Sequence, residues 1–201
     1  MRVNMPVTNV EVQLRPGDMI VSKTDLKGII TYVNEDFIRI SGFTEKELLG
    51  QPHNIVRHPD MPEEAFADLW SSLKAGRPWT GYVKNRCKNG DYYWVLANAT
   101  PIRENGQITG YMSVRTAPSR AEIAEVERLY RLFREGKQGN LVIRDGKVVK
   151  GGWREKLNPT PRHPEGPHAH PAGSRRGAPD GGRRHGAART GALLRQSQNR
   201  L

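Results

Sequence analysis

The alternation of apolar and polar residues near the start of the chain predicts a β-hairpin. Residues 19–24 (MIVSKT) and 29–34 (IITYVN) are two short runs rich in β-branched residues, and the polar turn sequence DLKG separates them. Residues 1–18 precede this pattern and are mixed in composition. We therefore expect an N-terminal cap or arm, followed by a domain that begins at residue 19.

A second group of strand-like runs follows further along the chain. Between these runs stand Asn89-Gly90 and Asn105-Gly106, dipeptides that favour the left-handed backbone of tight hairpin turns. The runs are residues 79–87, 91–104 and 107–116. Together with the first hairpin they predict five antiparallel strands.

Cap signals and apolar spacing predict three helices between the two groups of strands. Asn34 can cap a short helix, and Thr44 with Glu47 forms a capping-box pattern for the next one. Asp60 and Glu63 repeat that spacing before a helix whose apolar residues recur at i, i+3, i+4 and i+7. These residues are Phe66, Leu69, Trp70 and Leu73. The element order predicts an α+β domain over residues 19–117, an antiparallel sheet with short helices on one face.

Residues 118–153 predict a linker helix followed by a small hairpin. Ser119 and Glu122 form a further capping-box pattern, and Asp145-Gly146 is a hairpin signal. The apolar stripe of the helix consists of Ile123, Val126, Tyr130 and Phe133. Two interpretations stay open: helix 119–135 is a dimer contact or signal-output element, or it folds back onto its own sheet.

The composition changes abruptly after Trp153. Residues 154–201 contain ten Lys+Arg and three Asp+Glu, so they carry +7 of the net charge of +11. They contain no Phe, Tyr or Trp, so we expect a disordered tail that binds nucleic acid only non-specifically. A frameshift in GC-rich DNA would produce such a break, and reading the other frames of the coding DNA tests this. Biased composition explains the four histidines of the tail better than a metal site does.

The remaining composition excludes several classes of protein. Cys87 is the only cysteine, which excludes an internal disulfide and a multi-cysteine metal site. No apolar stretch is long enough for a membrane span, and no signal peptide is evident. The sequence contains no P-loop, GxSxG, HExxH or GxGxxG motif. We therefore expect a cytoplasmic protein that is not an enzyme and holds no metal.

Two groups of residues indicate a small-molecule site. Arg57, His58 and Asp60 stand together before the third helix, where a guanidinium and a helix N-terminus favour an anion. Asn85 and Asn98 interrupt two strands, and a buried amide there needs a hydrogen-bond partner such as a heterocycle. The aromatic side chains of the same region include Trp70, Trp79 and Tyr93. Without a ligand, the same residues would be a helix cap, solvent-exposed side chains and ordinary core.

These residues make the chain similar to PAS domains, and among them to the FAD-binding sensor domains of bacterial aerotaxis receptors. The similar segments run from about residue 24 to residue 116 and include RHPDMP (57–62) and PWTGYVKNRCKNGDYYWV (78–95). Helix 119–135 and KGGW (150–153) also resemble the linker of these receptors. The resemblance implies a five-stranded PAS sheet that holds FAD non-covalently and senses redox state or oxygen in energy taxis. It also implies a homodimer, formed through the N-terminal arm or helix 119–135.

The resemblance assigns roles to individual residues. The positions associated with FAD binding are Arg57, His58 and Asp60, and those that would line the flavin are Trp79, Asn85 and Tyr93. We add Asn34, Asn98 and Trp70 as further candidates. The chain departs from the light-sensing LOV flavoproteins at Val95, where they carry Asn, and at Arg115, where they carry Gln. Residues 54–58 also contain no cysteine, so no cysteinyl-flavin photoadduct is expected.

Two other functions stay open at this point. One is a cofactor-free PAS module for dimerisation or protein binding, and the other is a haem-binding PAS domain with His53 or His58 as ligand. Aerotaxis-type receptors continue into a membrane anchor, a HAMP domain and a kinase-control domain. Because the family pattern ends just after Trp153, we expect a chain that senses but lacks an output domain.

Overall fold

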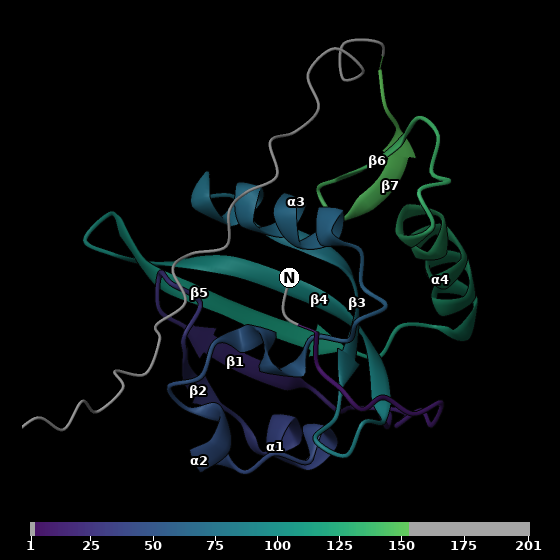
Figure 1. Ribbon diagram of the computed structural model, residues 1–201. Helices are drawn as coiled ribbons and strands as arrows, with labels where there is room; N and C mark the ends of the chain where they lie inside the picture. The colour runs from purple at the N-terminus through teal and green to yellow at the C-terminus, as the bar shows by residue number, and fades with distance from the viewer. Residues whose placement is uncertain (1–2, 153–201) are drawn as a thin grey trace, which may run out of the picture. The chain divides into compact units, whose positions relative to one another are not determined.

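The computed structural model of the protein describes residues 3–152 (Figure 1). They contain a five-stranded antiparallel sheet with the strand order β2-β1-β5-β4-β3. The strands are β1 (Ile20–Thr24), β2 (Ile30–Val33), β3 (Trp79–Arg86), β4 (Tyr92–Glu104) and β5 (Gln107–Thr116). The predicted sheet is therefore confirmed. The first hairpin and the later group of three strands join into one sheet because β1 pairs with β5.

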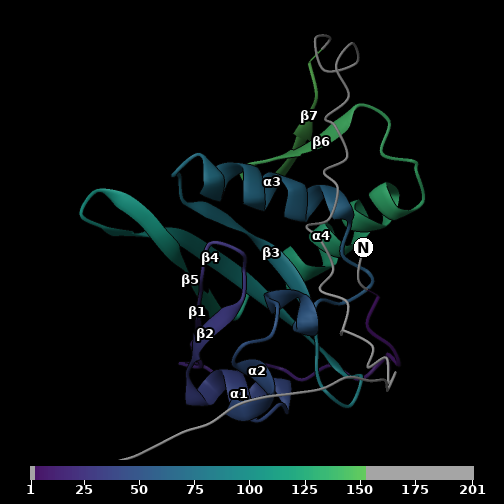
Figure 2. The ribbon, with the colours of Figure 1, turned by 60° about the vertical axis from the view of Figure 1, so that its left-hand side comes forward.

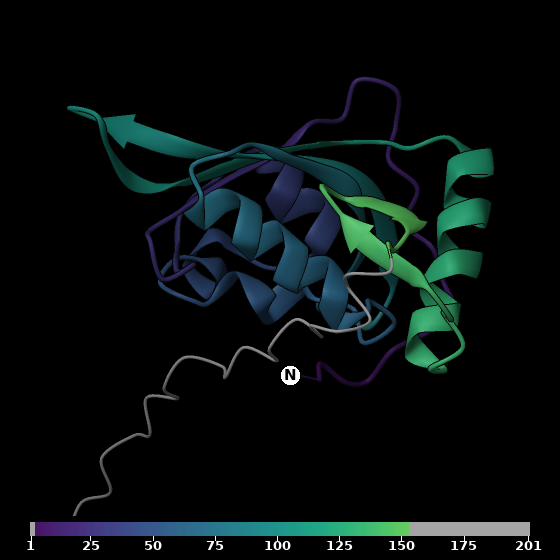
Figure 3. The ribbon, with the colours of Figure 1, turned by 90° about the horizontal axis from the view of Figure 1, so that it is seen from above.

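The helices that separate the two groups of strands gather on one side of the sheet (Figure 3). They are α1 (Glu35–Ser41), α2 (Glu45–Leu48), the 3-10 helix η1 (His53–Val56) and α3 (Glu63–Lys74). Side chains alternate between the two faces of a strand, so every second residue of the sheet meets these helices. We call this covered side of the sheet the inner face, and the opposite side the outer face.

The caps of the first two helices form as predicted. The Asn34 side-chain oxygen accepts the backbone N–H of Phe37 at 3.2 Å, and Thr44 and Glu47 form a reciprocal capping box. Such caps each contribute about 1 kcal/mol because they satisfy N–H groups that the helix itself leaves without partners.

The cap predicted at Asp60 is wrong. Helix α3 has Pro62 at its N-cap position and no side-chain cap, and its first residue is Glu63. The carboxylate of Asp60 instead accepts a hydrogen bond from Nζ of Lys84 at 2.7 Å. A charged donor from another strand thus takes the carboxylate that the local spacing assigned to the helix, and Pro62 supplies the extended backbone of the cap.

The core lies between the inner face and the helices. It consists of large apolar side chains from the helices and the connections between them, packed against the sheet, and a fully buried side chain of this kind contributes about 1.5–3 kcal/mol. The core residues include Phe37, Ile40, Leu48, Val56, Met61, Trp79 and Val95.

Helix α4 (Arg120–Arg134) folds back onto the outer face of its own sheet. Its apolar stripe is buried, and the Tyr130 hydroxyl donates to the backbone carbonyl of Tyr82 at 3.0 Å. The rings of Tyr130 and Trp94 lie 6.5 Å apart. Of the two interpretations of this stripe, the structure shows the fold-back contact. A dimer through the N-terminal arm stays a prediction.

The last described segment is a two-stranded hairpin, β6 (Leu141–Arg144) and β7 (Lys147–Lys150). Asp145 and Gly146 at its turn have φ angles of 49° and 77°, as a tight two-residue turn requires. Figure 2 shows this hairpin alongside α3. The disorder, charge and frameshift predictions for residues 154–201 lie outside the described residues.

The N-terminal arm is bound to the domain by polar contacts. The Asn4 side-chain nitrogen donates to the carbonyls of Asn54 and Arg57, and the carbonyl of Pro6 accepts from Arg86. Among residues 3–152, no helix is both long and apolar enough to cross a bilayer.

Candidate functional site

Several polar side chains interrupt the apolar inner face of the sheet. Asn85 and Tyr93 are register partners on β3 and β4, and Arg115 lies on β5 opposite Ile20 of β1. Ser22 follows two residues later on the same face of β1. We call Ser22, Asn85, Tyr93 and Arg115, together with His53 of η1, the inner polar cluster.

Arg115 is the charged member of the inner polar cluster. Its side chain is buried, and one guanidinium nitrogen donates to Ser22 Oγ at 3.1 Å and to His53 Nε2 at 2.7 Å. The other terminal nitrogen has no hydrogen-bond partner, and no carboxylate within residues 3–152 pairs with this guanidinium. Burial lowers the pKa of Arg115 to about 10. A buried cation of this kind lacks its counter-charge.

His53 is held as a neutral imidazole in this cluster. Burial, and next the positive charge of Arg115, lower the pKa of His53 well below its ordinary value. Because Nε2 accepts from the guanidinium, the ring proton belongs on Nδ1. The same contact engages the nitrogen that a haem ligand would need.

Tyr93 and Asn85 are the two remaining members of the cluster, and the hydroxyl of Tyr93 is unused. Tyr93 is fully buried and its hydroxyl has no partner, so burial raises the pKa of this phenol. Asn85 is also buried, and its backbone forms a bridge with that of Arg57. The hydroxyl of Thr24, on the inner face of β1, has no partner either. Buried polar groups normally find partners, so these atoms indicate a ligand or ordered water.

Three other candidates border the same face. The Arg57 guanidinium lies over the ring of Phe66 at 3.8 Å, and its charge also contributes to the lowered pKa of His53. Trp79 is buried on β3, and Trp70 of α3 meets the ring of Tyr111 edge-on at 5.5 Å. The structure therefore brings Arg57, Trp79 and Trp70 to the side where the inner polar cluster lies.

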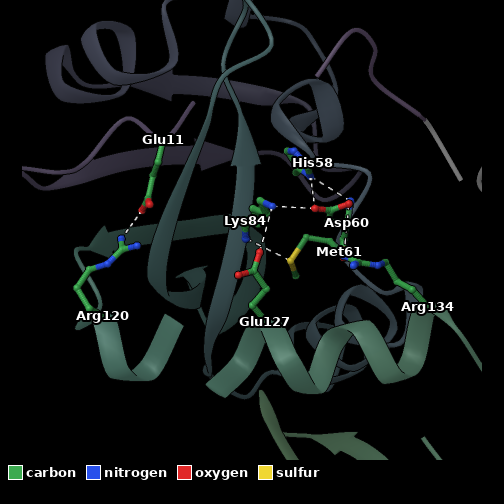
Figure 4. Close-up of polar contacts among 8 residues, drawn as sticks. All are labelled: Glu11, His58, Asp60, Met61, Lys84, Arg120, Glu127 and Arg134. Atoms are coloured by element: carbon green, nitrogen blue, oxygen red, sulfur yellow. Dashed lines mark hydrogen bonds and ion pairs between the residues drawn. The ribbon is translucent and has the colours of Figure 1, made fainter. Parts of the chain in front are cut away.

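His58 and Asp60 belong to a different group, at the edge between β3 and α4 (Figure 4). Nζ of Lys84 contacts Asp60 at 2.7 Å and Glu127 at 3.5 Å, and Arg134 donates to the backbone carbonyl of Asp60 at 2.7 Å. His58 Nδ1 accepts the backbone N–H of Asp60 at 3.1 Å, and burial, with Lys84, lowers the pKa of His58 to about 4. Because Lys84 and Asn85 are adjacent on one strand, this edge cluster lies on the side opposite the inner polar cluster.

Asn34 and Asn98 have other contacts. The Asn34 amide oxygen accepts the backbone N–H groups of Val21 and Phe37, and the amide nitrogen donates to the carbonyl of Met19. Asn98 lies exposed on the outer face and accepts from the hydroxyl of Thr80 at 2.9 Å. The structure does not bring either amide to the inner polar cluster.

The sequence alone did not identify Ser22, named His53 only as a possible haem ligand, and noted Arg115 only as a departure from LOV proteins. The signal for Arg115 was strand alternation, because a charged residue at an inward position of a central strand requires a special environment. No local signal identifies Ser22 or His53, since each acquires its role only through contact with Arg115.

The inner face is covered by its own side chains. Trp79 exposes 2% of its surface, and Tyr93 and Val95 expose none. A flat ligand on this face therefore has to displace some of these side chains. A surface groove of about 590 Å³ lies instead along β2 and α1, and Asn34 is the one candidate that lines it. Within residues 3–152, no three His, Cys, Asp or Glu side chains are grouped to hold a metal ion.

Comparisons with known proteins agree with this fold. Residues 30–115 match a family model described as the PAS fold. The aerotaxis receptor of Escherichia coli K12 is 51% identical over 155 residues, which are 77% of this chain and 30% of the receptor. The nitrogen fixation regulatory protein of Klebsiella pneumoniae is 29% identical over 100 residues, 49% of this chain and 20% of that protein. The chain thus spans less than a third of either relative.

A solved structure supports the same architecture. The light-state structure of the blue-light photoreceptor Aureochrome1 LOV superposes with a TM-score of 0.50 at 18% identity, covering 60% of this chain and 94% of that one. At this identity the likeness concerns the fold alone.

Proposed function

The chain carries a PAS domain, and 77% of its residues align with an aerotaxis receptor at 51% identity, so we propose that it is a flavin-binding redox sensor of energy taxis. Its cofactor is FAD, bound non-covalently on the inner face of residues 19–117. The observation that supports this most strongly is Arg115, a buried guanidinium without a carboxylate and with one nitrogen unpartnered.

The donor set suits the polar edge of a flavin ring. Asn85, Tyr93 and Arg115 would hold that edge, because their amide, hydroxyl and guanidinium groups supply both donors and acceptors. Trp79 would flank the ring, and Arg57 is the candidate for the phosphates. When bound, a flavin supplies reversible uptake of electrons and protons.

The residues of the cluster respond differently to the two redox forms. Arg115 favours whichever form places more negative charge near its guanidinium, and Ser22 and His53 fix its position. Asn85 can donate or accept and therefore adjusts to a change in ring protonation. Such differential contact is the requirement for signalling, and coupling of about 1–3 kcal/mol is typical.

The test is the absorption spectrum of the freshly purified full chain, recorded with and without dithionite. We expect two visible flavin bands that bleach on reduction, and release of FAD, not FMN, on denaturation, as measured by mass spectrometry. Protein that stays colourless after addition of FAD would reject the proposal. One intense Soret-type band would instead support haem.

The covered inner face favours one other function, a PAS module that binds a protein partner without a cofactor. In that case Asn85→Ala leaves both fold and partner binding intact. For the flavin sensor, the same variant keeps the fold but weakens retention of the yellow colour.

A further inference from the structure

One carboxylate on α3 accepts hydrogen bonds from two distant parts of the chain. Asp68 Oδ2 accepts the indole N–H of Trp79 and the backbone N–H of Gly146, both at 2.7 Å. Its other oxygen accepts the backbone N–H of Asp145 at 2.9 Å. Hydrogen bonds to an ionised group are about twice as strong as neutral ones, so this carboxylate connects β3 strongly to the β6–β7 hairpin.

The hairpin turn is in close contact with the edge strand of the sheet. A Cβ atom added to Gly146 would overlap the backbone carbonyl of Thr80 and press on Gly81. A Cβ atom added to Gly81 would overlap the indole ring of Trp79. Glycine at these two positions therefore permits the turn, the strand backbone and the Trp79 ring to stack without a gap.

Weaker contacts support the same docking. Ser72 Oγ donates to the carboxylate of Asp145 at 3.5 Å, and Arg77 lies 3.9 Å from that carboxylate. Ile143 and Val148 pack against the main core, and Figures 1 and 2 both show the hairpin beside α3. The hairpin is thus part of the folded domain, attached at its turn.

We propose that Asp68 couples the Trp79 ring on the inner face to the β6–β7 hairpin. One oxygen is shared by the two donors, so a displacement of the indole moves the carboxylate that holds the turn, and a displacement of the turn does the reverse. Such coupling is reciprocal. It provides a route from the inner face to residues 141–150, and it holds with or without a flavin.

Amide and indole hydrogen exchange, followed by NMR on the full chain, tests the coupling. Gly146→Ala places a methyl group against Thr80 and should detach the turn. We expect the backbone N–H of residue 146 and the indole N–H of Trp79 to exchange at least about tenfold faster, since each loses or loosens a charge-assisted bond.

Gly106→Ala is the matched control. Gly106 occupies the same position of a two-residue hairpin turn with a φ of 81°, close to the 77° of Gly146, but its Cβ would meet nothing within 4 Å. This variant shares the backbone strain and should leave both exchange rates unchanged. A detached hairpin with an unchanged Trp79 indole rate overturns the proposal, and so does a Gly146→Ala variant whose hairpin stays protected.

Asp68→Asn tests the contacts of the carboxylate itself, because the side chain keeps its size. The amide oxygen accepts without the negative charge of the carboxylate, so the bonds to the turn and to the indole both weaken and both groups should exchange faster. Glu64→Gln, which removes a charge from an exposed position of the same helix, should change neither. Release of only one of the two groups by Asp68→Asn would show that the carboxylate holds them independently and would refute the coupling.

Discussion

Replacing Arg115 by Met should leave the flavin-free protein almost as stable as before, although the side chain is buried. A pKa lowered from 12.5 to about 10 means that burial of the charge costs ~3 kcal/mol at neutral pH. Against this, the variant loses two bonds from a charged donor, to Ser22 and His53, which together contribute about 3 kcal/mol at ~1.5 kcal/mol each. The lower value per bond applies because Ser22 Oγ and His53 Nε2 also contact each other at 3.1 Å. The two contributions nearly cancel, so the free energy of unfolding should change by less than ~1 kcal/mol.

Urea unfolding of the flavin-free protein at pH 7, followed by circular dichroism, measures this change. Arg128→Met is the control, because Arg128 is exposed and its partner within residues 3–152 is Glu125, so its loss should leave the free energy of unfolding almost unchanged. A buried arginine with a real carboxylate partner would instead cost about 3–5 kcal/mol on removal. A loss of that size in Arg115→Met would refute the claim that this cation lacks a counter-charge.

The same variant should bind FAD more weakly by about tenfold to a hundredfold, the effect of one lost hydrogen bond to a charged donor. Fluorescence quenching of added FAD measures the affinity. An unchanged affinity would remove Arg115 from the proposed site while leaving the argument about its burial intact. The stability result and the affinity result therefore test different statements.

Three further outcomes are expected. Lowering the pH from 6.5 to 4 should destabilise the protein by up to ~3 kcal/mol through His58. The folded pKa of about 4 lies below the unfolded value, so the unfolded state binds more protons in this range. His58→Asn should flatten the plot of unfolding free energy against pH, and a slope equal to that of the unmodified protein would contradict this. Asp60→Asn removes the carboxylate that lies 3.4 Å from the Arg134 guanidinium, so it should weaken docking of α4 by up to ~1 kcal/mol and speed amide exchange in residues 120–134. Glu125→Gln should not, and equal rates in the two variants would exclude the edge contact. Burial raises the pKa of Cys87 to about 12, so a thiol reagent at pH 8 should label it only after unfolding, and rapid labelling of native protein would show that the thiol is accessible.

Most of the fold could be read from local patterns. The hairpin turns at Asn105-Gly106 and Asp145-Gly146, and the capping boxes that begin at Thr44 and Ser119, all form where the sequence places them. These signals are reliable because each depends on the backbone conformation of a few adjacent residues. The error at Asp60 had the opposite origin, since a partner from a remote strand, Lys84, competes for the same carboxylate.

The sequence by itself determined which strands and helices exist and in what order, because turn, cap and alternation signals act over a few residues. Only the tertiary structure decided how the candidate residues divide between two sides of the sheet. It placed Arg115 against His53 and Ser22, and Trp79 and Gly146 on one carboxylate of α3. The physical reason is that a buried polar group takes whatever partner the packing brings within about 3 Å, and that partner comes from anywhere in the chain.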